Sequence, residues 1–256
     1  MERALGLYAY KFWWKLKQFA YLVLGIYRHT DERVCPAFPD GNFYDHFRIY
    51  HFASQFVQGR TVLDVGCGTG YGTHYMLQKG ARLAIGIDNS TEAIRYAKTH
   101  RIQHLEYRWM DAQQMTFPDA SFDVVVSVDN LEHLPDPARN IMEIRRVLRP
   151  SGILILSTPN KELSSPGLAG TTNPFHFREF YFEELERLLR GSFRHLLVIE
   201  NKKASGSPIG RDMKEHRVAQ GKVGIEHDGA TQVTLDGTVV NLEGLRNDYS
   251  FVAIAR

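Results

Sequence analysis

Cysteine is scarce in this chain of 256 residues, with Cys35 and Cys67 as its only members, so a fold held together by several disulfides is excluded. An excess of one charge is also missing. The formal net charge of +2 excludes both the strongly basic surface of nucleic-acid-binding proteins and the highly charged composition of disordered chains. We therefore expect no nucleic-acid partner, and we expect a reducing compartment, the cytoplasm.

Long hydrophobic runs are absent from the first thirty residues, where the apolar run Phe19 to Ile26 is too short to span a bilayer. No small-residue cleavage site follows it, which argues against a secretory signal. The same thirty residues contain eight aromatic and five basic residues but one acidic residue. A helix of this kind over residues 8–27 can lie on the inner membrane surface, fold over the domain as a lid, or form the face of a homodimer. These three alternatives stay open.

Apolar runs and helical segments alternate between residue 60 and about residue 200. We predict strands over 62–65, 83–87, 105–109, 124–128 and 153–157, separated by short helices, with Asp136-Pro137 at the start of one of them. Such alternation predicts an α/β fold with a Rossmann-like, doubly wound parallel sheet. Residues 1–59 then form a helical N-terminal extension, and residues 60–256 form the main domain. An insertion over 201–247 carries a predicted β-hairpin around Asp236-Gly237.

The most informative motif is a glycine-dense loop that follows the first predicted strand, Val62-Leu63-Asp64-Val65-Gly66-Cys67-Gly68-Thr69-Gly70. Glycine lets the backbone approach a ligand closely and adopt dihedral angles that other residues avoid. The spacing is G-x-G-x-G and does not fit the dinucleotide pattern G-x-G-x-x-G. This form is the one used for S-adenosylmethionine (SAM). The alternative interpretation is a tight turn between strand and helix that binds nothing.

Four acids come at the carboxyl ends of predicted strands, where ligands bind in doubly wound sheets: Asp64, Asp88, Asp111 and Asp129. Asp88 is placed to accept both hydroxyls of a ribose, and Asp111 to accept the amino group of adenine. Asp64 can stabilise the glycine loop or contact the amino group of the ligand. Asp129 and Asn130 could hold a magnesium ion, but their spacing is not diagnostic, and we assign no metal ligands.

The chain resembles the class I SAM-dependent methyltransferases in an ordered set of motifs: Val62 to Gly70, Ala84 to Ser90, Met110-Asp111-Ala112, Phe117 to Asp123 and Leu131-Glu132-His133-Leu134. The resemblance implies a seven-stranded sheet whose last strand is antiparallel. It also implies SAM as cofactor, with the methionine part near Asp64 and the loop glycines, ribose on Asp88, and adenine near Asp111 and Ala112. The resulting set of cofactor-binding candidates is Asp64, Gly66, Cys67, Gly68, Gly70, Asp88, Asn89, Asp111, Ala112 and Asp129.

A second resemblance lies in Asn173-Pro174-Phe175-His176-Phe177-Arg178-Glu179-Phe180, which is similar to methyltransferases of glycan and polysaccharide biosynthesis. It implies O-methylation of a saccharide or glycoconjugate hydroxyl. The aromatic N-terminus favours a lipid intermediate or secondary metabolite as the alternative acceptor. A SAM-binding scaffold without turnover is the alternative of a different class. We expect the loop 158–178 and the insertion 201–247 to select the acceptor.

A hydroxyl is a poor nucleophile unless its proton is removed, and histidine suits this task near neutral pH. His133 follows the fourth predicted strand, and a histidine in this loop can be the base in related small-molecule O-methyltransferases. His176 is the second candidate base, and Glu132 can orient His133. Each has a purely structural alternative. Glu132 and His133 can simply pack their loop against the next helix, and His176 can contact substrate or pack the loop that contains it.

Overall fold

A computed structural model describes Val34 and residues 41–99, 102–201, 216–218, 232–235, 238–241 and 250–256. The N-terminal helix predicted over residues 8–27 lies outside these residues, as does its predicted contact with a membrane or a second chain. Helices and strands alternate through the described part in this order: α2 Gly41–Ala53, η1 Ser54–Phe56, β1 Thr61–Val65, α3 Tyr71–Gln78, β2 Leu83–Asp88, α4 Thr91–Ala97, β3 Leu105–Trp109, β4 Phe122–Val128, η2 Leu131–His133, α5 Pro137–Val147, β5 Leu148–Pro159, α6 Lys161–Ser164, α7 Phe182–Arg190, β6 Leu196–Asn201, β7 His216–Val218, β8 Gln232–Leu235, β9 Thr238–Asn241 and β10 Ser250–Ala255.

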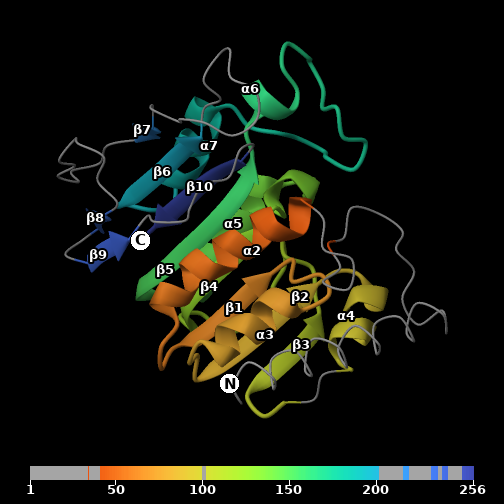
Figure 1. The fold of residues 1–256 in the computed structure, drawn as a ribbon, viewed down its shortest axis with the longest axis vertical. Helices are drawn as coiled ribbons and strands as arrows, with labels where there is room; N and C mark the ends of the chain where they lie inside the picture. Colours follow the sequence, from red (N-terminus) through yellow and green to blue (C-terminus); the bar gives the residue numbers. More distant parts are fainter. Residues whose placement is uncertain are drawn as a thin grey trace, which may run out of the picture.

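The main sheet has the strand order β3-β2-β1-β4-β5-β10-β6-β7 (Figure 1). Strands β1 to β5 are parallel, whereas β10 runs antiparallel between β5 and β6. The predicted doubly wound sheet with an antiparallel last strand is therefore confirmed. The short strand β7, which comes from the 201–247 insertion, adds an eighth strand at the edge beside β6. The strand order reverses between β1 and β4, so a crevice is expected at their carboxyl ends.

Two apolar layers cover the two faces of the sheet, because alternate strand residues point to opposite sides. Val62 of β1 packs with α2, α3 and α4, whereas Leu63 and Val65 pack with α5 and α7. Figure 1 shows α2 and α3 lying across one face of the sheet. Every residue of β1 is buried, as expected for a central parallel strand. Helix α2 is thus part of the folded domain, although its sequence belongs to the predicted extension 1–59.

Local signals in the sequence set several helix starts. The hydroxyl of Ser90 accepts a hydrogen bond from the Ala93 amide at α4, and Asp136 caps α5 with Pro137 in its first turn. Strand β5 is longer than the strand predicted over 153–157, since it begins at Leu148 and ends at Pro159. Helix α7 begins at Phe182, and the carboxylate of Glu184 accepts the amide of Tyr181 just before it.

The predicted hairpin in the insertion is present, with β8 and β9 paired antiparallel in a two-stranded sheet of their own. The remaining residues of the insertion, apart from Asn201 and β7, lie outside the described part of the chain. No helix within that part is both long and apolar enough to cross a bilayer.

Candidate functional site

A cavity of about 530 Å³ opens at the carboxyl ends of the central strands. Its walls come from α2, from the loops after β1, β2 and β4, and from the segment between β5 and α7. This is the position at which doubly wound sheets bind ligands, and the volume lies within the range of small-molecule sites. Most of the residues that line the cavity carry polar side chains.

The glycine loop after β1 depends on positive φ angles. Gly66, Gly68 and Gly70 have φ values of 73°, 51° and 81°. A methyl group on Gly70 would overlap the ring of Tyr107, whose hydroxyl donates to the Gly70 carbonyl at 2.7 Å. A methyl group on Gly68 would meet no atom within 4 Å among the described residues, and Gly68 lines the cavity. The loop therefore exposes its backbone to the cavity at Gly68 and is held by the protein at Gly70.

Asp88 stands at the end of β2 and lines the cavity. One carboxylate oxygen accepts the amide of Gly68 at 2.9 Å, and the other accepts the amide of Ser90 at 2.8 Å. Each carboxylate oxygen can accept more than one hydrogen bond. Asp88 thus joins the glycine loop to the start of α4 and keeps acceptor capacity directed at the cavity.

Asp64 is fully buried in β1 and does not line the cavity. It accepts hydrogen bonds from the hydroxyls of Thr73, at 2.6 Å, and Tyr50, at 3.1 Å. Burial raises the pKa of Asp64 to about 7, although these two hydrogen bonds act in the opposite direction. Asp64 thus joins β1 to α2 and α3 through these two hydroxyls, and its predicted roles toward the glycine loop and the ligand stay predictions.

The other cofactor-binding candidates fall into two groups, those that line the cavity and those that do not. Cys67, Asn89 and Asp129 line the cavity, whereas Asp111 and Ala112 do not. Asp111 is exposed and accepts the amide of Gln113 at 2.8 Å. Burial raises the pKa of the Cys67 thiol well above its ordinary value, so this thiol stays protonated. The binding roles of all these residues stay predictions.

Asp129 pairs with a histidine that the sequence did not single out. Its carboxylate lies 3.0 Å from Nε2 of His46 on α2 and accepts the hydroxyl of Ser157 at 2.6 Å. Burial opposes ionisation of Asp129, but His46 and Ser157 outweigh it, and the pKa falls below its ordinary value. The residue also has a φ of 42°, uncommon for aspartate. Each carboxylate oxygen of Asp129 therefore already has a partner, Oδ2 in His46 and Oδ1 in Ser157.

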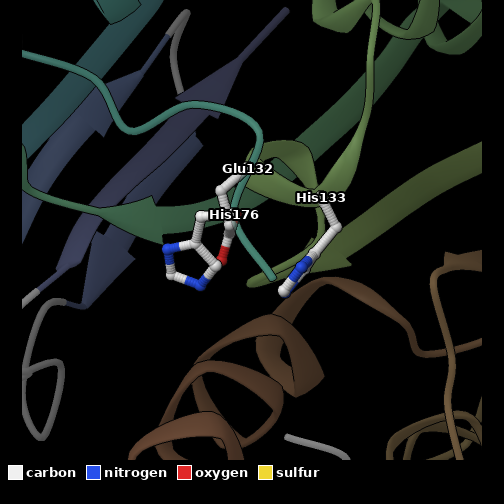
Figure 2. Close-up of side chains that lie close together, drawn as sticks. All are labelled: Glu132, His133 and His176. Atoms are coloured by element: carbon white, nitrogen blue, oxygen red, sulfur yellow. The ribbon is translucent and has the colours of Figure 1, made fainter. Parts of the chain in front are cut away.

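The three catalytic candidates lie close together, as Figure 2 shows, and all three line the cavity. Glu132 and His133 come from η2 after β4, and His176 comes from the loop before α7. The rings of His133 and His176 are 4.9 Å apart between centroids and nearly perpendicular. Glu132 is buried and accepts the hydroxyl of Thr158 at 2.9 Å. His133 and His176 are far apart in the sequence. Their two segments are joined by the amides of Phe177 and Arg178, which donate to the Glu132 carbonyl.

A buried acid orients His176. Oε1 of Glu179 lies 2.7 Å from Nδ1 of His176, and Oε2 accepts the hydroxyl of Ser164 at 2.6 Å. Burial alone would raise the pKa of Glu179, but hydrogen bonds from Ser164, Ser165 and His176 lower it overall. An ionised carboxylate can only accept, so Nδ1 of His176 carries the proton. Nε2 of a neutral His176 is then an acceptor, which agrees with the Asn173 amide nitrogen 2.9 Å away.

Sequence reasoning missed His46 and Glu179. His46 lies in α2, whose sequence stands out only by its aromatic residues. No pattern in that sequence indicates that α2 crosses the end of β4. Glu179 follows His176 by three residues, and this spacing could have indicated a pair.

Residues 63–156 match the family model described as "Methyltransferase domain". This segment is therefore similar to methyltransferase domains. Over 162 residues, covering 62% of this chain and 62% of the relative, the chain is 38% identical to "Probable S-adenosylmethionine-dependent methyltransferase" of Mycolicibacterium smegmatis. Over 107 residues, covering 40% of this chain and 46% of the relative, it is 40% identical to a ubiquinone biosynthesis O-methyltransferase of Pseudomonas paraeruginosa. The chain thus spans less than two thirds of the length of these relatives.

A solved structure shares the fold of this chain over most of its length. The PH0226 protein of Pyrococcus horikoshii superimposes with a TM-score of 0.57 at 20% identity, over 87% of this chain and 96% of that chain. The Mycolicibacterium smegmatis relative is named as dependent on S-adenosylmethionine. The similarity to methyltransferases of polysaccharide biosynthesis is not among these findings.

Proposed function

We propose that the chain is a SAM-dependent O-methyltransferase, with the cavity at the carboxyl ends of β1, β2 and β4 as its active site. The observation that carries the proposal is the meeting of the glycine loop and Asp88 with a pair of histidines in one cavity. The methyltransferase domain supplies the class of reaction. The histidines supply the proton acceptor that transfer to a hydroxyl needs.

The residues of the cavity fit SAM. Gly68 leaves open space above the loop, so a ligand can approach its backbone, and Asp88 is placed to accept the two hydroxyls of a ribose. SAM supplies a methyl group that is already activated by the positive charge on sulfur. The main task of the protein is therefore to align the acceptor oxygen and to take its proton.

We assign the proton acceptor to His133, with His176 as the second candidate. Nδ1 of His133 lies 3.1 Å from the carbonyl oxygen of Phe175, which can only accept, so this nitrogen carries the proton. Nε2 of the neutral ring then has the lone pair that accepts a proton from the acceptor hydroxyl. Glu132 supports this loop through its carboxylate, which accepts the hydroxyl of Thr158, and through its carbonyl, which accepts the amides of Phe177 and Arg178.

A saccharide or glycoconjugate is the acceptor we propose, because the cavity is lined mainly by groups that form hydrogen bonds. Asn42 and Asp45 of α2 and Asn173 of the loop before α7 stand on its walls. The second candidate acceptor is a phenolic hydroxyl on an apolar molecule. The similarity to a ubiquinone biosynthesis O-methyltransferase favours it, as do the exposed rings of Phe175 and Phe177 beside His176.

The test is transfer of a labelled methyl group from SAM to a panel of sugars, oligosaccharides, glycolipids and phenols. Label on a saccharide supports the main proposal, and label on phenols alone supports the second candidate. Each assay is run with and without added magnesium. Tight binding of SAM without transfer to any member of the panel would leave the scaffold alternative as the better account.

A further inference from the structure

We propose that Glu132, His133 and His176 form a binding site for a divalent transition-metal ion of the zinc type. The site lies in the cavity of the proposed function, but the inference concerns ion binding and not methyl transfer. One potential ligand atom from each of the three side chains lies within 4.8 Å of the other two. Figure 2 shows the three side chains directed toward one shared space, from two segments of the chain.

Two histidines and one carboxylate are a ligand set that zinc uses, in a geometry that leaves further positions open. Bonds of about 2.0–2.2 Å require ligand atoms no more than about 4 Å apart, so a small adjustment of the side chains completes the site. Imidazole nitrogen favours zinc, iron, cobalt or nickel over magnesium. The inferred ion therefore differs from the magnesium considered at Asp129 and Asn130, where Asp129 is committed to His46 and Ser157.

Both histidines are already held in the tautomer that binds metals. The Nδ1 proton of His133 points at the Phe175 carbonyl, and that of His176 points at Glu179. In each ring, Nε2 is then the nitrogen with a lone pair. A carboxylate or carbonyl behind each metal-binding histidine is the usual outer support of such sites. Glu179 is 1% exposed, so its carboxylate is a fixed partner and not a mobile surface group.

Two contacts would change when an ion binds. The Asn173 amide nitrogen lies 2.9 Å from Nε2 of His176 and would have to move away from it. Oε2 of Glu132 accepts the hydroxyl of Thr158 at 2.9 Å, and the carboxylate has a second oxygen that can face the ion. The bound ion would hold the Nε2 lone pairs of both histidines, so His133 can accept a proton only in the ion-free chain. The ion-bound chain would instead lower the pKa of a coordinated hydroxyl through the ion.

Ion binding can be measured without SAM or an acceptor. The full chain is stripped with a chelator, and Zn²⁺ binding is followed by calorimetry and Co²⁺ binding by its visible absorption. We expect one ion per chain, with absorption typical of nitrogen and oxygen ligands. His133→Ala, His176→Ala and Glu132→Gln should each lower the affinity by more than about 100-fold. Glu179→Gln, which removes only the outer support, should lower it about 10- to 100-fold.

His51→Ala is the matched control, because His51 is an exposed histidine of α2 that does not line the cavity. It should leave ion affinity unchanged, and thermal melting checks that each variant is folded. The inference is overturned if the wild type binds no ion, or if the ligand variants bind as tightly as the wild type. Methyl transfer by the stripped chain separates the two proposals. Transfer without any ion binding overturns this inference alone, whereas ion binding without transfer supports it and counts against the proposed function.

Discussion

Oε1 of Glu179 lies 2.7 Å from Nδ1 of His176, and the two side chains are only 1% and 9% exposed. A buried, ionised acid fixes both the orientation of the ring and the nitrogen that carries its proton. Glu179 and His176 therefore act as one unit at the edge of the cavity. The pair links the stability of the loop before α7 to the chemistry that we propose for the cavity.

Glu179→Gln tests this unit. Glutamine can keep a hydrogen bond to Ser164, but it offers His176 no negative charge. We expect methyl transfer to fall about 10- to 100-fold while SAM affinity changes little. A fixed-time assay with labelled SAM measures the rate of methyl transfer, and calorimetry measures SAM affinity. Arg190 pairs with Glu186 on the surface of α7, so Glu186→Gln is the control and should leave both quantities unchanged. Normal turnover in Glu179→Gln would show that His176 needs no charged partner.

Asp88→Asn should weaken SAM binding. The substitution removes a charged acceptor of the ribose hydroxyls and offers an amide group where the amide of Gly68 or Ser90 now donates. Loss of charged hydrogen bonds of this kind predicts an increase in Kd of about 10-fold or more. Asp111→Asn is an informative comparison, because Asp111 is exposed and lies outside the cavity wall. A loss in Asp111→Asn as well would support the predicted contact of Asp111 with adenine, whereas an unchanged Kd in Asp88→Asn would contradict the place given to SAM along β2.

Gly70→Ala should destabilise the fold. The residue has a φ of 81°, and a methyl group there would lie 2.5 Å from the Tyr107 ring. Strain and overlap together predict a loss of at least about 2 kcal/mol in the free energy of unfolding, measured with urea. Gly41→Ala is the control, since a methyl group there meets nothing within 4 Å among the described residues. Gly68→Ala carries strain without overlap, so its stability should fall less than that of Gly70→Ala.

Asp64 should make stability depend on pH. Its carboxyl has a pKa of about 7 in the fold because it is buried, whereas an unfolded aspartate ionises near pH 4. The folded chain therefore holds a proton that the unfolded chain releases. The contribution of Asp64 is fully present below about pH 4 and is lost as pH rises to about 7, by roughly 4 kcal/mol.

Urea unfolding of wild type and Asp64→Asn between pH 4.5 and 8 checks this expectation. The free-energy difference between the two proteins should change steadily up to about pH 7 and then level off. Asp123 and Glu143 have lowered pKa values and act at more acidic pH, but they are the same in both proteins and cancel. A difference that stays constant with pH would mean that Asp64 ionises normally.

Much of the fold could be predicted because its signals are local. Buried parallel strands produce mostly apolar runs such as Val124 to Val128, which only Ser127 interrupts, and Ser90 and Asp136 mark helix starts by hydrogen bonds within three residues. The glycine loop was predictable for the same reason, since its positive φ angles need glycine. Strand β7 was not predicted, because a three-residue edge strand leaves little pattern in a polar insertion.

The site was harder to predict, because its contacts join distant segments. Asp129 meets His46, 83 positions away, only because α2 crosses the end of β4. His133 and His176 meet because two amides after His176 donate to the carbonyl of Glu132. Asp64 differs from these residues, because it belongs to the glycine-loop motif but is buried and accepts hydrogen bonds from Thr73 and Tyr50. The sequence placed Asp64 and Asp129 at strand ends but could not say which of them would face the cavity.

The central claim is that this cavity transfers a methyl group from SAM with help from His133. The most direct measurement is the single-turnover rate of methyl transfer to the best acceptor, for wild type and His133→Ala, with SAM affinity measured in parallel. We predict a rate lower by about 100-fold or more and a SAM affinity within about twofold of wild type. An unchanged rate with SAM bound would contradict the assignment of His133.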